Sequence, residues 1–114
     1  RANAAEGLLR LGDTSAIALA AELARHPDPS IRGAAAQALS ASPDDQAFTL
    51  LKALLLDQQP LPRLSAAKAL RKSNDRAIPI LVQGLRDTDE AVRIAAANSL
   101  LQQLAKQPAS KRRR

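Results

Sequence analysis

The segment RGAAAQAL, residues 32–39, decides the fold because its pattern returns at nearly constant intervals along the chain. The pattern R-x-x-A-A-x-x-L occurs four times, as RANAAEGL at 1–8, RGAAAQAL at 32–39, RLSAAKAL at 63–70 and RIAAANSL at 93–100. Its arginines, Arg1, Arg32, Arg63 and Arg93, are 31, 31 and 30 residues apart. A period of this length is typical of proteins that stack one supersecondary unit on the next.

A second apolar pattern precedes each of the three later arginines. It contains four apolar residues at relative positions i, i+1, i+3 and i+4, which form one face of an amphipathic helix. Its members are Ala16, Ile17, Leu19 and Ala20, then Ala47, Phe48, Leu50 and Leu51, then Ala77, Ile78, Ile80 and Leu81. Each unit is therefore predicted to be a helix A, a turn and a helix B that carries the arginine.

The predicted helices follow from these two registers. We expect a B helix at about 1–11, A and B helices at 14–25 and 30–41, at 45–57 and 61–72, and at 76–86 and 89–106. Asp13, Asp44 and Asp75 are predicted to cap the A helices, and Pro29 and Pro60 suit the first turn of a B helix. The shorter last repeat is expected to lose its residue between Asp75 and Ala77.

Composition agrees with an all-α protein. Hydrophobic residues make up 46% of the chain, mainly Ala and Leu, and Phe48 is the only aromatic residue. The chain has no cysteine, which excludes disulfides, thiolate nucleophiles and cysteine-based metal sites. No run of the sequence approaches the ~18–20 consecutive apolar residues of a membrane span.

The net charge of +6 comes largely from the C-terminal tail, which contains Lys111, Arg112, Arg113 and Arg114. Without them, 13 basic residues face 11 acidic ones, so the remaining chain is close to neutral. We therefore divide the sequence into a repeat domain over residues 1–107 and a basic tail over 108–114 that we expect to be disordered. Because the domain opens inside a repeat, we also expect further repeats or another domain before it.

The helical hairpin with R-x-x-A-A-x-x-L on its second helix resembles the HEAT repeat. The short period of about 31 is similar to the subclass named after phycobilisome lyases. The resemblance implies an α-solenoid of about three and a half hairpins, wound into a right-handed superhelix with B helices on the concave side. Members of the family serve as scaffolds, adaptors and enzyme subunits, and a few bind nucleic acid, so the fold alone does not choose a function.

The column of repeat arginines permits two interpretations. A periodic row of cations suits phosphate binding, but the resemblance favours a structural role, in which each arginine pairs with an aspartate of an intra-repeat turn and the pairs form a ladder between neighbouring repeats. Asp28 and Asp89, four residues before Arg32 and Arg93, are the predicted partners, and Gln59 occupies that place in the middle repeat.

The exposed positions of the B helices are the candidate binding surface. Counted five and nine residues after each arginine, they include Glu6, Arg10, Gln37, Lys68, Lys72, Asn98 and Gln102. The third repeat thus presents Lys68, Arg71 and Lys72 together. This cluster suits an acidic peptide or a phosphate backbone, and equally a solvated helix end at which cations meet the negative dipole terminus.

No catalytic or cofactor-binding set is predicted. His26 is the only histidine and lies in a turn, Asp44 and Asp45 suit helix capping better than acid–base chemistry, and the four glycines form no phosphate loop. We therefore expect no enzyme activity, no cofactor and no metal.

The preferred functional hypothesis is a protein-binding or scaffold module whose partner is another protein or another domain of the parent chain. The first alternative is binding of nucleic acid or an acidic surface through Lys68, Arg71, Lys72 and the basic tail. It is not favoured, because the chain has almost no aromatic residues for base stacking. The second is a repeat subunit of a pigment- or cofactor-handling enzyme. Self-association through exposed ends of the solenoid is also expected, whereas the compartment is not indicated.

Overall fold

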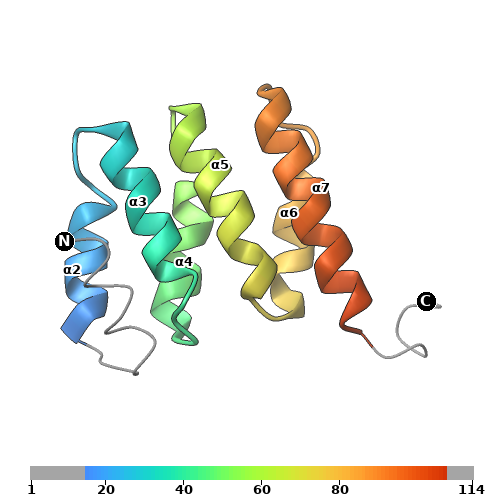
Figure 1. The fold of residues 1–114 in the computed structure, drawn as a ribbon, viewed down its shortest axis with the longest axis horizontal. Coiled ribbons are helices and arrows are strands. Elements are labelled where there is room, and N and C mark those ends of the chain that lie inside the picture. Colours follow the sequence, from blue (N-terminus) through green and yellow to red (C-terminus); the bar gives the residue numbers. More distant parts are fainter. Residues whose placement is uncertain (1–14, 108–114) are drawn as a thin grey trace.

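The computed structural model describes residues 15–107, which form six α-helices and two short 3₁₀ helices, with no strand in that range (Figure 1). The α-helices are α2 (Ser15–Leu23), α3 (Pro29–Leu39), α4 (Asp45–Leu54), α5 (Pro60–Ala69), α6 (Ile78–Gly84) and α7 (Glu90–Ala105). The 3₁₀ helices are η1 (Leu70–Lys72) and η2 (Asp75–Ala77). The predicted helix at 1–11, the cap Asp13 and the tail at 108–114 lie outside the described residues.

The helices form hairpins that stack in one direction. The A helices α2, α4 and α6 each pack against the B helix that follows, namely α3, α5 and α7. The three B helices lie side by side in one layer, with α4 and α6 behind them (Figure 1). The predicted all-α solenoid of helical hairpins is therefore confirmed.

Alanine and leucine of the repeat pattern make the core. Ala36 and Ala67, which occupy equivalent places in α3 and α5, are 0% exposed, as are Leu39 and Leu70. Full burial of a leucine side chain contributes about 1.5–3 kcal/mol, and the small alanines let neighbouring helices approach closely. The consensus thus alternates large and small residues to join successive hairpins.

Helix starts follow the predicted chemistry at most positions. The Asp44 carboxylate accepts a hydrogen bond of 2.8 Å from the backbone N–H of Gln46 and caps α4, as expected. Proline begins α3 and α5, where the missing N–H leaves no intrahelical bond unmade.

The predicted cap Asp75 is wrong, because Asn74 caps this helix instead. The Asn74 side chain accepts from the backbone N–H of Arg76 at 3.1 Å, and Asp75 is the first residue of η2. Asn74 is thus equivalent to Asp44, each three residues before the buried alanine of its A helix. The residue missing from this repeat therefore lies before Asn74. The shortened connection is tightened into η1, so α5 ends at Ala69 rather than near residue 72.

A close approach of the A helix α6 to the B helix α7 gives a first prediction. A methyl group placed on Gly84 would lie 2.8 Å from the Cβ of Ala96, which is fully buried. We expect Gly84→Ala to lower the free energy of unfolding by about 1–3 kcal/mol, because α6 and α7 must move apart to accommodate the added methyl group. This net loss already includes the gain of about 1 kcal/mol in helix propensity when alanine replaces glycine. Urea unfolding followed by circular dichroism measures this, with the exposed neighbour change Gln83→Ala as control. A Gly84→Ala protein as stable as the parent would contradict the packing.

Candidate functional site

Two arginine–aspartate pairs join successive hairpins, and we call them the arginine–aspartate ladder. The guanidinium of Arg32 in α3 donates to Asp57 of the next hairpin, with Nε–Oδ2 at 2.8 Å and Nη2–Oδ1 at 3.0 Å. Arg63 in α5 binds Asp87 in the same way, at 3.0 and 3.2 Å. Such two-point contacts fix the direction as well as the distance between the charged groups. The ladder therefore sets how each hairpin lies against the next.

The same arginines also hold the turn of their own hairpin. The Nη1 of Arg63 donates to the backbone carbonyls of Asp57 at 2.9 Å and Gln58 at 3.1 Å. Arg32 does so with the carbonyls of residues 26 and 27, and Arg93 with those of 87 and 88. Each of these arginines thus satisfies carbonyl groups in the A–B turn that precedes its helix.

The ladder uses different aspartates from those predicted. Asp28 and Asp89 cap α3 and α7, by accepting from the backbone N–H groups of Ser30 at 2.9 Å and Val92 at 3.1 Å. Their carboxylates are engaged at a helix start rather than with an arginine. The partners are Asp57 and Asp87, which lie two residues before the helix-capping position of their own turn. Each of them belongs to the hairpin that follows the hairpin of its arginine. The structural role of Arg32 and Arg63 is thus as expected, whereas the assigned partners were wrong.

The Arg32–Asp57 pair of the ladder is largely shielded from solvent. The Arg32 and Asp57 side chains are only 16% and 13% exposed. The hydrogen bond from Arg32 lowers the pKa of Asp57 below its usual value, and the same bond raises the pKa of Arg32. Both groups stay charged at neutral pH.

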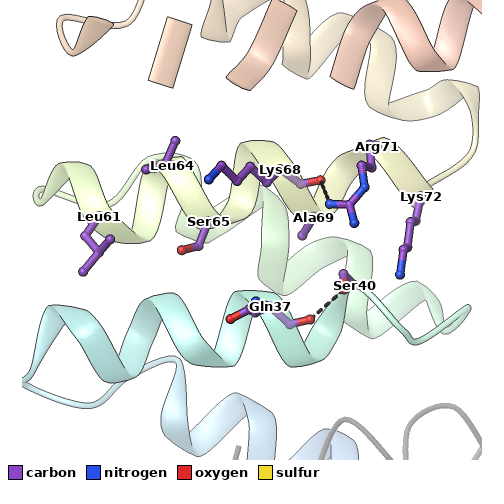
Figure 2. Close-up of a pocket in the computed structure, with 9 residues that line it drawn as sticks. All are labelled: Gln37, Ser40, Leu61, Leu64, Ser65, Lys68, Ala69, Arg71 and Lys72. Atoms are coloured by element: carbon purple, nitrogen blue, oxygen red, sulfur yellow. Dashed lines mark hydrogen bonds between the residues drawn. The ribbon is translucent and has the colours of Figure 1, made fainter. Parts of the chain in front are cut away.

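A polar groove lies between the B helices α3 and α5, with a volume of about 300 Å³ (Figure 2). Leu61 and Ser65 of α5 and Lys72 of η1 extend towards α3, opposite Gln37 of α3 and Ser40, which caps its end. The described lining contains three basic side chains and no acidic one. Its residues are Gln37, Ser40, Leu61, Leu64, Ser65, Lys68, Ala69, Arg71 and Lys72. We call this hollow the α3–α5 groove.

The structure brings together four of the sequence-predicted site residues, Gln37, Lys68, Arg71 and Lys72, in the α3–α5 groove. Asn98 and Gln102 are exposed on α7 but do not line it. Glu6, Arg10 and the tail residues Lys111, Arg112, Arg113 and Arg114 lie outside the described residues. Sequence reasoning missed Ser40, Leu61, Leu64 and Ser65, although Leu61 was detectable as a large apolar residue outside the consensus.

The three cationic side chains of the groove differ in whether they already have a hydrogen-bond partner. Arg71, in η1, is half-buried, and its Nη1 donates to the carbonyl of Lys68 at 3.0 Å, near the end of α5. This contact places the Arg71 guanidinium at the C-terminal end of α5, where a cation meets the negative end of the helix dipole. Lys68 and Lys72 are exposed, and within residues 15–107 neither ammonium has a hydrogen-bond or ion-pair partner. These two groups are available to a ligand.

The comparison with known families agrees with this geometry. The model described as HEAT repeats matches residues 1–71 and 49–112, which together span nearly the whole chain. The chain belongs to the HEAT repeat family. HEAT repeats are generally protein-interaction scaffold modules, typically without catalytic activity. No curated protein matches the sequence, and membership of the phycobilisome-lyase-type subclass stays a prediction.

His26, the single histidine of these HEAT repeats, makes a structural contact in a turn. His26 lies half-buried in the first A–B turn, where its Nδ1 accepts from the backbone N–H of Asp28 at 3.0 Å. Among the described residues, no group of three or more His, Cys, Asp or Glu side chains is arranged to hold a metal ion. Within the same range, no helix combines the length and apolar character that crossing a membrane requires.

The ladder of these HEAT repeats gives a second prediction. Asp57→Asn keeps the shape of the side chain but leaves the Arg32 guanidinium without its counter-charge. We expect the free energy of unfolding at pH 7 to fall by about 1–3 kcal/mol. Asp45→Asn is the matched control, because Asp45 pairs with Arg76 at 2.7 Å but its side chain is 86% exposed. The control should change stability by no more than about 0.5 kcal/mol.

The same pair predicts a pH dependence. Because the folded-state pKa of Asp57 is lowered from 3.8, its contribution to stability is complete above that value and is lost as the pH falls through the folded pKa. The stability difference between the parent and Asp57→Asn should therefore shrink below about pH 4. A difference that stays constant under acid would show that the carboxylate charge is not its source.

Proposed function

We propose that the chain is a non-catalytic protein-binding module that holds an acidic segment of a partner in the α3–α5 groove. The observation that carries the proposal is the charge of this groove, whose described lining contains Lys68, Arg71 and Lys72 and no acidic residue. Charge complementarity of this kind selects partners and speeds their encounter. The partner is another protein or another domain of the parent chain.

Apolar groups in the same groove favour a peptide over a bare anion. Leu61 is 45% exposed, and Leu64, which is half-buried, also lines the groove. An apolar side chain of the ligand can cover these leucines while neighbouring carboxylates reach the lysines. Binding sites commonly combine apolar contact area with a few placed polar groups in this way. The proposed ligand is therefore a segment in which glutamate or aspartate stands near leucine or a similar residue.

This surface is less suited to binding nucleic acid than to binding an acidic peptide. The single aromatic residue, Phe48, lies in the A helix α4, and the Arg76 guanidinium covers its ring at 4.3 Å from the centroid. Within residues 15–107 the B helices therefore offer no ring on which a base can stack. Contacts would be limited to phosphates and would fall steeply with salt. A pigment- or cofactor-handling role finds no aromatic anchor in this groove either.

Charge reversal tests the proposal. A short fluorescein-labelled peptide of glutamate and leucine serves as the probe, and fluorescence anisotropy measures its binding to the full chain. We expect Lys68→Glu with Lys72→Glu to weaken binding by at least about tenfold, a loss of about 1.4 kcal/mol. The control is Lys52→Glu with Arg86→Glu, which changes the net charge equally at exposed positions on the A-helix side. This control should bind like the parent.

Two further titrations separate the alternatives. A peptide with glutamine in place of leucine should bind more weakly if Leu61 and Leu64 contribute. Labelled duplex DNA at two salt concentrations tests the nucleic-acid alternative. Equal losses of peptide binding in the two double variants would show that net charge alone causes the effect, and this result would contradict the proposal. So would duplex binding that is tighter than peptide binding and depends on Lys68 and Lys72. Removal of residues 111–114 measures the tail separately.

A further inference from the structure

The B helix of the last described hairpin, α7, carries in its first turn an arginine that is oriented for a contact it does not make. Arg93 donates from Nη1 to the carbonyls of Asp87 at 2.8 Å and Thr88 at 3.2 Å, as Arg32 and Arg63 do in their own turns. This holds its guanidinium in the place that the ladder arginines occupy. Within residues 15–107, however, no carboxylate binds its Nε and Nη2 edge.

Apolar residues around Arg93 are exposed where their equivalents are buried. Leu55, at the end of the second A helix, is 6% exposed, whereas the equivalent Leu85 is 39% exposed. Ala97 is only half-buried, although both of its equivalents in α3 and α5 are fully buried, and the same holds for Leu100. Ile94, one position after the arginine, is 54% exposed. In α3 this position is Gly33, which faces Ser65 and Leu61 of the next B helix.

We propose that this surface, the α7 end face formed by Leu85, Arg93, Ile94, Ala97 and Leu100, binds a helical hairpin of a partner protein. The hairpin's turn would present an aspartate to the free edge of Arg93, and its apolar side would cover the exposed leucines and isoleucine. The contact continues the geometry by which the second described hairpin, through Asp57, packs against Arg32. It is separate from the α3–α5 groove and does not depend on the function proposed for that groove.

Charge complementarity argues for a different protein rather than a second copy. In the first described turn, His26 stands six residues before the repeat arginine, where the later turns have Asp57 and Asp87. Its Nδ1 already accepts from the Asp28 N–H, and it offers no carboxylate. Two α7 end faces placed together would bring one Arg93 against another. Self-association, expected from the sequence, is therefore an alternative outcome of the experiment.

A hairpin peptide with the required aspartate is contained in the chain itself. The probe is a labelled synthetic peptide of residues 74–107, which spans α6 and α7 and carries Asp87, titrated against the full chain and followed by fluorescence anisotropy. The matched probe differs only by Asp87→Asn. We expect the aspartate peptide to bind about tenfold more tightly, since a charge-assisted two-point contact is lost in the matched peptide. Because this comparison leaves the full chain unaltered, a folding defect of the full chain cannot account for the difference, and circular dichroism of the two peptides checks that they are equally helical.

Variants of the full chain then locate the contact. Arg93→Gln should remove the preference for the aspartate peptide, and Ile94→Glu should abolish binding of both peptides. Lys68→Glu with Lys72→Glu should leave binding unchanged, which keeps this result distinct from that of the α3–α5 groove. Equal affinity of the two peptides, or no binding of either, would overturn the proposal. A dimer in sedimentation that Ile94→Glu dissolves would assign the face to a second copy and would also overturn it.

Discussion

The stacking of the hairpins depends on an arginine guanidinium that binds the turns of two neighbouring hairpins at once. One part of Arg32 binds carbonyl groups of its own turn, and the other part binds the Asp57 carboxylate of the next hairpin. A planar group with several fixed donors can do this, whereas a lysine ammonium cannot reproduce the fork. The pairs are partly buried, so they orient the hairpins more than they add net stability. Stability comes mainly from the alanine and leucine side chains packed behind them.

This division of roles leaves the outer side of the B helices available for recognition. Ala36 and Ala67 are buried between the helices, while Gln37 and Lys68, one residue later in the repeat, are exposed. Positions such as Gln37 and Lys68 therefore vary without cost to the core. In this chain they create a basic groove between α3 and α5, and the same stacking of hairpins leaves Arg93 and Ile94 uncovered on the α7 end face. Both candidate surfaces thus follow from one repeated geometry.

The sequence predicts the fold well because the repeat period and the helical spacing of apolar residues agree with each other. It does not predict the aspartate partners, because Arg32 and Asp57 are 25 residues apart and meet only through stacking of hairpins. Asp28, nearer along the chain, is held at its helix start by Ser30. Exposed B-helix positions are predictable by counting from each arginine. Which of them face a common groove is not, since this depends on how Leu61 and Ser65 oppose Gln37 across two helices.

A pair of double-mutant cycles tests the central claim most directly. Urea unfolding of the Arg32→Gln and Asp57→Asn variants, singly and together, gives the coupling energy between hairpins. A second cycle pairs Arg32→Gln with Asp28→Asn inside one turn. We predict a coupling of about 1–3 kcal/mol for Arg32 with Asp57 and less than about 0.5 kcal/mol for Arg32 with Asp28. A strong coupling within the turn and none between hairpins would contradict the account.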